Sequence, residues 1–506
     1  MSVNLIGAAV LALSAQVSGV AQTTAPNATQ RPSQSAPAPI QDPALNGQGE
    51  NPGGTEPFSA NSPSPITSAI SPSPSQAEAA SEFEHWRRTN PIGRELRRLT
   101  DAGVTLKLNF ISNYADNPVG GNRQGFDTSG WIDGGADIDL KKLVGWSGAT
   151  IHIQGADFYG RSDGKDYVGN AISFQQTWRQ VSGPRLTQLN IEQNLFDNKL
   201  NIMLGRAAVN TYYASSPLNC LFMSNTTCLA LYGPITTIGI TAFPNSSWAG
   251  KVRYAPTSRT YAQIGAFQYD NYLNTRGRDG LDLGNSGKVG AIIPGEVGYE
   301  TSFANDELPR RYRAGFYYNT LGATDPYFDS KGGAALLDKL THVTYSGGRI
   351  GVYDLIDQTV WRERPGTKDN LALFQRVFYN AGNTNTVDLF GEVGLVQTGT
   401  FADRHEDTIG LMVSDTRFSS RELEYLGELR AKVGGEGRPL RDEIIGEINY
   451  GYEMVPGFRW VPNFQWVINP DPINAPKAKA DIPSAIVIGL KVDIHFAELF
   501  GGRYTR

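Results

Sequence analysis

The sequence predicts an all-β protein, a transmembrane antiparallel β-barrel of about sixteen strands that follows a disordered N-terminal region. Three observations support this prediction. Apolar and polar residues alternate with a period of two from Gly103 to Phe496. Short and long connections alternate along the same stretch, as in barrels that have short periplasmic turns and long outer loops. No window holds the roughly 20 apolar residues of a membrane helix, so strands would have to span any membrane.

Composition narrows the possible functions. The 506 residues carry a formal net charge of −5, so the chain lacks the basic field that a nucleic-acid partner would require. Five His and two Cys leave little material for a metal site. We therefore expect no cofactor and no nucleic-acid partner.

The chain begins with segments that we expect to lie outside the barrel. Residues 1–21 have an apolar run that ends in small residues, which indicates a signal peptide and export, with a disordered tail as the alternative. Residues 22–80 are rich in Pro and Ser and are predicted to be a disordered linker, because this composition cannot bury enough apolar surface to fold. A tether to the cell wall or to a periplasmic partner is the alternative for this stretch.

Residues 81–102 differ from the linker and are predicted to form a short helical segment at the mouth of the barrel. Apolar residues recur there at helical spacing among Arg and Glu, and Asn90-Pro91 should break the helix. A solvated connector is the alternative. At the other end of the chain, residues 497–506 form a tail beyond the last predicted strand, which ends near Phe496.

The stretch Leu186–Arg206, LTQLNIEQNLFDNKLNIMLGR, reads as a β-hairpin with chemically different faces. Asp197, Asn198 and Lys199 supply its turn. Leu200, Ile202 and Leu204 alternate with polar residues and are predicted to face lipid. In a soluble sandwich the same face would meet a second sheet, which is the alternative fold.

Fourteen further stretches share this alternation, which brings the predicted total to sixteen strands. They are GVTLKLNFISN, WIDGGADIDL, ATIHIQG, AGKVRYA, TYAQIGAFQY, GEVGYETSF, RRYRAGFYYN, GRIGVYDLI, NLALFQRVFYN, TVDLFGEVGLVQ, DTIGLMVS, EIIGEINYGYEM, FRWVPNFQWVI and AIVIGLKVDIHF. Aromatic residues near strand ends are expected at the membrane interface, namely Tyr254, Tyr317, Tyr318, Trp460 and Trp466.

No catalytic motif stands out. There is no Gly-x-Ser-x-Gly elbow and no His pair at metal-binding spacing, so we expect the protein not to be an enzyme. Cys220 and Cys228 lie eight residues apart in a loop-like stretch. In an exported protein this proximity favours a disulfide, with two free buried thiols as the alternative.

Three segments resemble the carbohydrate-selective porins, the OprB type, of Gram-negative outer membranes. They are ADIDLKKLVGWSGATIHIQGADFYG, the hairpin described above, and EIIGEINYGYEMVPGFRWVPNFQWVINPDPIN, and the likeness extends from Gly103 to Phe496. The resemblance implies a sixteen-stranded barrel in the outer membrane that passes mono- and small oligosaccharides. Sugars or polyols and outer-membrane lipid would be its partners, and the porin would be a monomer or a homotrimer.

If the apolar face points outward, charged residues at alternate positions point into the lumen, where a dry core could not hold them. They are Asp133, Asp137, Asp139, Glu192, Arg311, Arg313, Glu392, Glu443, Glu447, Arg459, Lys491 and Asp493. From these and one inward aromatic ring we select as pore-lining, sugar-binding candidates Asp137, Asp139, Glu192, Tyr353, Glu392, Glu447 and Arg459. The alternative for each charged candidate is a salt bridge that only stiffens the wall.

The sequence leaves other functions open. A broader-specificity solute or ion porin could use the same barrel. An outer-membrane hydrolase would need a nucleophile and base that we do not find, and an exported β-sandwich used for adhesion would need a second sheet.

Overall fold

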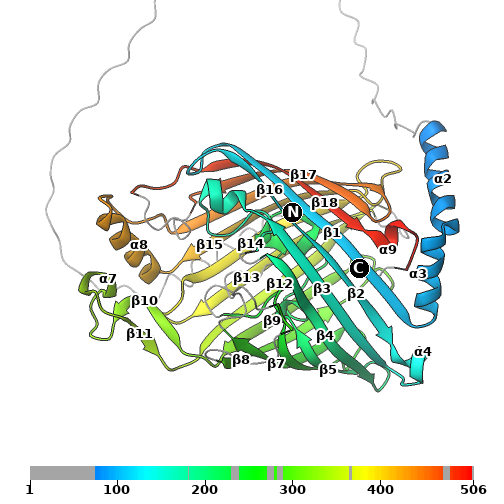
Figure 1. Cartoon of the computed structure of the whole chain (residues 1–506), viewed down its shortest axis with the longest axis horizontal. Helices are drawn as coiled ribbons and strands as arrows, with labels where there is room; N and C mark the ends of the chain where they lie inside the picture. Colours follow the sequence, from blue (N-terminus) through cyan, green and yellow to red (C-terminus); the bar gives the residue numbers. More distant parts are fainter. Residues whose placement is uncertain are drawn as a thin grey trace, which may run out of the picture. The chain divides into compact units, whose positions relative to one another are not determined.

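The protein forms a closed antiparallel β-barrel of sixteen strands in the computed structural model (Figure 1). The structure describes residues 74–179, 182–228, 239–270, 279–281, 289–363, 367, 369–470 and 479–503. The barrel strands are β1 Val104–Val119, β2 Gly125–Asp139, β3 Ala149–Gly160, β4 Gly183–Leu195, β5 Leu200–Ala207, β6 Ser247–Tyr254, β7 Thr260–Asp270, β8 Val289–Glu300, β9 Arg310–Asn319, β12 Arg349–Arg362, β13 Asn370–Ala381, β14 Val387–Thr398, β15 Thr408–Phe418, β16 Asp442–Val455, β17 Phe458–Ile468 and β18 Ala485–His495. Each strand pairs with its neighbours in the chain, except that β12 follows β9, and β1 closes the barrel on β18. The predicted fold class is confirmed.

Connections differ in length between the two ends of the barrel. Turns such as 196–199, 255–259 and 456–457 lie at one end, which we call the turn end, together with α3 Pro91–Asp101, α4 Leu140–Val144 and α9 Phe496–Leu499. The opposite end, the loop end, carries the long loops and the short elements η1 Gly164–Val168, η2 Val209–Thr211, η3 Asn219–Leu221, α5 Asn225–Cys228, β10 Ala323–Asp329, α7 Ala335–Asp338, β11 His342–Tyr345 and α8 Ser420–Lys432. β10 and β11 form a separate two-stranded sheet.

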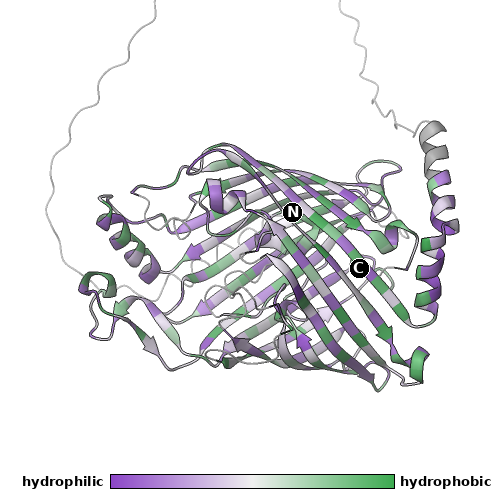
Figure 2. Cartoon of the chain, in the orientation of Figure 1, coloured by the Kyte–Doolittle hydropathy of each residue, from purple (hydrophilic) through white to green (hydrophobic). Residues whose placement is uncertain are grey.

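The hairpin of β4 and β5 shows how the pleat separates two environments. Leu204 is 59% exposed on the outer face, whereas its neighbour Met203 is fully buried inside the barrel. Leu189 on β4 is also exposed outward, and the adjacent Asn190 is buried. Hydropathy alternates in the same way along the other strands (Figure 2). The predicted register of this hairpin is confirmed, because a slip of one residue would exchange these faces.

The turn of this hairpin uses left-handed backbone. Phe196, Asp197 and Asn198 have φ of 54°, 55° and 65°, and Lys199 N–H donates to the Phe196 carbonyl at 3.1 Å. Asp and Asn tolerate this conformation better than most residues because their short side chains bond to nearby backbone. The Asp-Asn pair therefore supports the corner where the sequence predicted it.

One aromatic residue was assigned to the wrong face. Tyr254, Tyr318, Trp460 and Trp466 are exposed on the outer surface. Tyr317 is completely buried inside the barrel, because it has the opposite parity from Tyr318 on the same strand. The prediction that Tyr317 lies at the membrane interface was therefore wrong.

Two helices precede the barrel. α2 Pro74–Thr89 begins inside the stretch expected to be a linker, and the Asn90 side chain caps α3 by accepting from Gly93 N–H at 2.7 Å. The residues after β18 pack against this segment: Asn90 Nδ2 donates to the Phe500 carbonyl at 3.0 Å, and Trp86 contacts the Phe500 ring. The predicted signal peptide and residues 22–73 of the linker lie outside the described residues. None of the helices in the described ranges has the length and apolar character that a bilayer crossing requires.

Candidate functional site

The loop between β5 and β6 enters the barrel and crosses its interior. Its described residues, 208–228 and 239–246, bond to inward side chains on strands from β7 around the barrel to β18. We call this segment the crossing loop. Such contacts on widely separated strands require the loop to lie across the barrel interior, so any solute that traverses the barrel must pass beside it.

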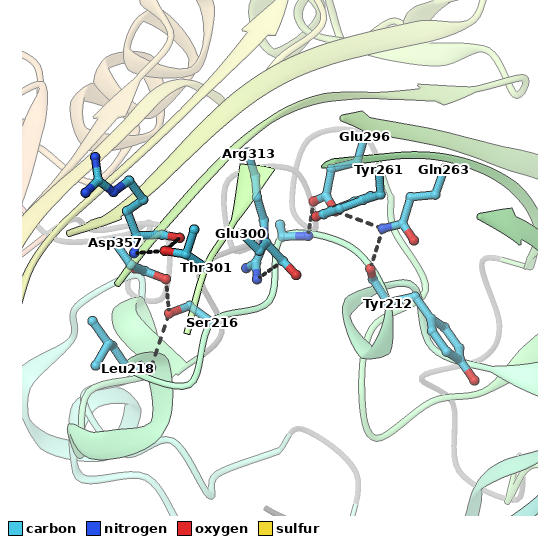
Figure 3. Close-up of polar contacts among 12 residues, drawn as sticks. Tyr212, Ser216, Leu218, Tyr261, Gln263, Glu296, Glu300, Thr301, Arg313 and Asp357 are labelled. Carbon is cyan, nitrogen blue, oxygen red and sulfur yellow. Dashed lines mark hydrogen bonds and ion pairs between the residues drawn. The ribbon is translucent and has the colours of Figure 1, made fainter. Parts of the chain in front are cut away.

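The first part of the crossing loop is bound to β7, β8 and β12 (Figure 3). Glu296 accepts from Ala214 N–H at 2.9 Å, and its other oxygen accepts from the Tyr261 hydroxyl at 2.8 Å. Ser216 Oγ donates to Asp357 at 2.7 Å. Buried carboxylates are thus satisfied by hydrogen bonds from the loop instead of by water.

The second part of the crossing loop is bound by a carboxylate that accepts hydrogen bonds from two consecutive backbone amides. Glu447 accepts from Met223 N–H at 2.9 Å and from Ser224 N–H at 2.8 Å. Thr227 Oγ1 donates to Glu392 on β14. Lys491 Nζ donates to the Cys220 carbonyl at 2.6 Å. This part of the loop is therefore attached to three separate strands.

A disulfide closes the same part of the loop. Cys220 and Cys228 are joined with an Sγ–Sγ distance of 2.08 Å, as predicted. The closed segment limits the conformations of the loop tip between its two anchor points.

The loop between β3 and β4 also folds inward, and a carboxylate binds two of its consecutive backbone amides in the same way. Glu443 accepts from Ala171 N–H at 2.8 Å and from Ile172 N–H at 3.2 Å. The two loops bond to each other, because Gln176 N–H donates to the Met223 carbonyl at 2.8 Å. Together they form one constricting unit inside the wall.

This β3–β4 loop holds an unusual acid. The Asp163 side chain is fully buried, and neither carboxylate oxygen has a hydrogen-bond partner within the described part of the chain. Burial, reinforced by the negative charges of Asp127, Asp116 and Asp166, raises the pKa of Asp163 to about 8. The folded loop therefore favours the protonated acid.

Aromatic rings stack beside the crossing loop. Tyr353 lies between Tyr317 and Phe378, with ring centroids 4.8 Å and 5.4 Å away. The Tyr353 hydroxyl donates to Glu296 at 2.8 Å, so this stack shares the carboxylate that anchors Ala214.

Toward the turn end, the inner wall carries a network of partly exposed charged and polar side chains. Asp137 contacts Lys107 Nζ at 2.6 Å and His152 Nδ1 at 2.8 Å. His152 Nε2 lies 3.8 Å from Glu192, which accepts from Asn201 at 2.9 Å. The network therefore runs across β1 to β5. Because its charges are of both signs, this network presents many hydrogen-bond donors and acceptors without a strong net positive or negative potential.

Pairs of opposite charge continue around the wall. Arg313 contacts Glu300 at 2.7 Å, and Arg459 contacts Glu453 at 2.8 Å. In the parts of the chain that the structure describes, no group of three or more His, Cys, Asp or Glu could hold a metal ion. Charged and polar side chains of both signs therefore line the inner wall beside the two infolded loops.

The family follows from comparison with known proteins. A model described as "Carbohydrate-selective porin, OprB family" matches residues 123–496. The chain belongs to this family. It is a porin of the Gram-negative outer membrane, and family membership implies a channel rather than an enzyme.

Individual relatives agree with this assignment. The porin is 27% identical to Porin B of Pseudomonas aeruginosa over 434 residues, which covers 83% of this chain and 93% of the relative. It is 23% identical to a putative porin, QuiX, of Acinetobacter baylyi, with 80% and 92% covered. A high-pH structure of Pseudomonas putida OprB superposes with a TM-score of 0.73 at 28% identity, covering 79% of this chain and 96% of that one.

The porin structure separates the sequence-predicted residues into distinct environments. Asp137 and Glu192 lie together in the partly exposed network. Arg459 lies at the turn end of β17, which only β18 separates from β1, and it is paired there with Glu453. Their contact with solute stays a prediction.

Three other candidates point inward but have less than 5% of their surface exposed. Tyr353, Glu392 and Glu447 are 4%, 2% and 0% exposed. Tyr353 packs between Tyr317 and Phe378, and Glu392 and Glu447 bond the crossing loop. A side chain with almost no exposed surface offers little to a passing sugar. We therefore correct their expected role from direct contact to support of the loop.

Asp139 lies away from the passage. It ends β2, and its carboxylate accepts from Lys141 N–H at 2.9 Å, so it caps α4 at the turn end. Capping of α4 is a sufficient structural reason for an Asp at this position. Its contact with solute is not supported by this position.

Sequence reasoning missed the residues that hold the crossing loop. Glu296 and Arg376 are inward on their strands, so the alternation of LFQRVF and GEVGYE could have identified them. Arg376 is fully buried and bonds Asn219 of the loop and Asp357 of the wall. The apolar content of NTYYASSPLNCLFM was a signal that this loop is buried, because exposed loops rarely carry so many large apolar residues.

Proposed function

We propose that sugars cross this porin by passive diffusion through the space between the constricting loops and the wall, without cofactor or catalytic turnover. The crossing loop supports this proposal, because its anchors on β8, β14 and β16 restrict the passage. Uncharged sugars gain nothing from net charge, so recognition must come from many weak hydrogen bonds that still permit release.

The network near the turn end supplies groups of the required kind. Asp137, His152 and Glu192 are each about one-fifth exposed, so part of each side chain remains accessible to solute in addition to its contacts within the network. Arg459 and Glu453, on β17 and β16, add a second set of donors and acceptors to the same part of the wall, with only β18 between β17 and β1. We propose that sugar hydroxyls exchange water for these groups as they pass.

Sugar block of ion current tests this proposal. Replacing both Glu192 and Arg459 by Ala should weaken block of single-channel current by glucose and maltose and raise the ion conductance itself. Liposome swelling with sugars and with amino acids of equal size measures selectivity in parallel. If block persists while conductance rises, these residues line only a wide part of the lumen. Equal swelling rates for both solute classes would instead favour a broader-specificity porin.

We also propose that the porin forms a homotrimer through the outer face of β12 and β13. Asp354 points outward there and accepts from Gln375 Nε2 at 3.0 Å, on a face otherwise rich in apolar side chains. A carboxylate facing lipid is costly, and contact with another copy would shield it. Replacing Asp354 and Gln375 by Leu should shift native mass spectra from trimer to monomer, and a wild-type monomer would contradict the proposal.

A further inference from the structure

A second exposed apolar surface lies at the turn end, apart from the passage. α3 presents Ile92 and Leu99, which are 51% and 38% exposed. The turn after β2 presents Leu143, Val144 and Trp146, which are 48%, 72% and 52% exposed. Large apolar side chains gathered at this density on a protein surface usually mark an interaction site.

Basic side chains flank these apolar residues. Arg94, Arg98, Lys141 and Lys142 are all exposed, and we call them, with the five apolar residues, the α3–α4 patch. The two segments are joined directly, because Lys142 Nζ donates to the Thr100 carbonyl at 2.9 Å. The patch is therefore one continuous surface.

The acidic groups near the patch already form ion pairs or a helix-capping hydrogen bond. Glu95 is paired with Arg98 at 3.2 Å, Asp101 is paired with Arg503 at 3.0 Å, and Asp139 caps α4. The basic groups consequently outnumber the carboxylates that could neutralise them. An anionic partner would complement this surface.

The patch is continuous with the lipid-facing wall. Leu106 and Leu108 of β1 are exposed outward, and Ile138 of β2 pairs with Ile151 of β3 just before the turn that carries Val144. α3 and α4 adjoin the ends of these strands in Figure 1. Apolar side chains at this level, with Lys and Trp beside them, match the boundary between acyl chains and headgroups.

We propose that the α3–α4 patch lies in the inner leaflet of the outer membrane and binds anionic phospholipid. Leu143, Val144 and Trp146 enter the acyl region, while Lys141 and Lys142 contact the phosphates. Lysine side chains reach such headgroups by extending from a buried stem, and each adds a modest preference for negative lipid. The patch would thereby hold the N-terminal helices flat against the leaflet.

Fluorescence quenching tests this proposal directly. Val144→Cys adds one free thiol for a fluorophore, because the two native cysteines are joined to each other. The labelled porin is placed in vesicles of phosphatidylethanolamine with or without phosphatidylglycerol, and spin-labelled versions of each lipid serve as quenchers. Heat-modifiable gel migration confirms that each variant is folded before measurement.

Phe401→Cys is the matched control. Phe401 is 52% exposed at the same end of the barrel, but the nearby Arg404 is paired with Asp407 at 2.7 Å. We expect both labels to be quenched by lipid, but only the Val144 label to favour phosphatidylglycerol. That preference should be roughly 30-fold, since two lysines at about 1 kcal/mol each give about 2 kcal/mol, and it should disappear in the K141Q/K142Q background.

Two results would overturn the proposal. Quenching at Phe401 without quenching at Val144 would place the patch outside the bilayer and favour a periplasmic protein or a second copy as its partner. Quenching at Val144 that is equal for both lipids and insensitive to the lysine changes would remove the anionic specificity. Neither readout depends on sugar transport, so the test is independent of the proposed selectivity.

Discussion

Glu447 provides a stringent test of how the passage is constricted. Its carboxylate accepts from Met223 and Ser224 N–H and from Asn449 Nδ2, at 2.9, 2.8 and 2.8 Å. Each hydrogen bond to a charged group contributes roughly 1.5–3 kcal/mol. Glu447→Ala therefore removes about 3–6 kcal/mol from the docking of the loop tip through the two backbone bonds alone. A loss of even 3 kcal/mol increases the undocked population of the tip more than 100-fold, as about 1.4 kcal/mol corresponds to a factor of ten.

The undocked tip should widen the passage intermittently. We expect Glu447→Ala to raise single-channel conductance, increase open-channel noise and weaken block by sugars in planar bilayers. Glu447→Gln should have a smaller effect, because one amide oxygen can still accept from the loop. Asp306→Ala is the matched control, since this carboxylate in the turn after β8 also accepts from a backbone amide, Leu308 N–H, but contacts neither infolded loop. Conductance of folded Glu447→Ala channels equal to that of the wild type would refute the reasoning.

Three further perturbations address the wall and the loops. Leu204→Arg puts a charge on the lipid-facing side of β5 and should cost roughly 2–4 kcal/mol if it lies at mid-bilayer, measured by denaturant unfolding in lipid; a change near zero would place this residue in the lumen or at an interface. Because burial raises the pKa of Asp163 to about 8, the β3–β4 loop should be most stable below the unfolded pKa of roughly 4 and should weaken as pH rises toward 8. Hydrogen exchange of that loop should show this trend in the wild type and lose it in Asp163→Asn, and a trend retained in the variant would assign it to another group. Replacing Cys220 and Cys228 by Ser should reduce the stability of the loop tip by roughly 2–3 kcal/mol on the chain-entropy model, and unchanged hydrogen exchange at the tip would show that the anchors alone hold it.

The fold could be predicted because a barrel wall repeats one local rule. A strand side chain points alternately to lipid and to the interior, so parity along the chain assigned Leu204 outward and Met203 inward without tertiary information. The same rule identifies Glu447 as inward. The misassignment of Tyr317 came from grouping it with Tyr318 by residue type instead of by parity.

The alternation along a strand predicts which side chains point into the barrel. It does not predict whether water or an infolded loop surrounds them there. Glu447 is inward as predicted, yet it is fully buried because loop residues more than 220 positions away in the chain donate to it. Glu192, with the same inward orientation, stays about one-fifth exposed although Tyr212 of the crossing loop lies within hydrogen-bonding reach of it. The sequence by itself determined the class of fold, the register of the strands and the family resemblance, since these depend on local alternation and short motifs. Only the tertiary structure decided which inward residues are accessible to solute and which bind the loops. The interior of the barrel contains both water and infolded loops, and contacts between residues far apart in the chain determine where each lies.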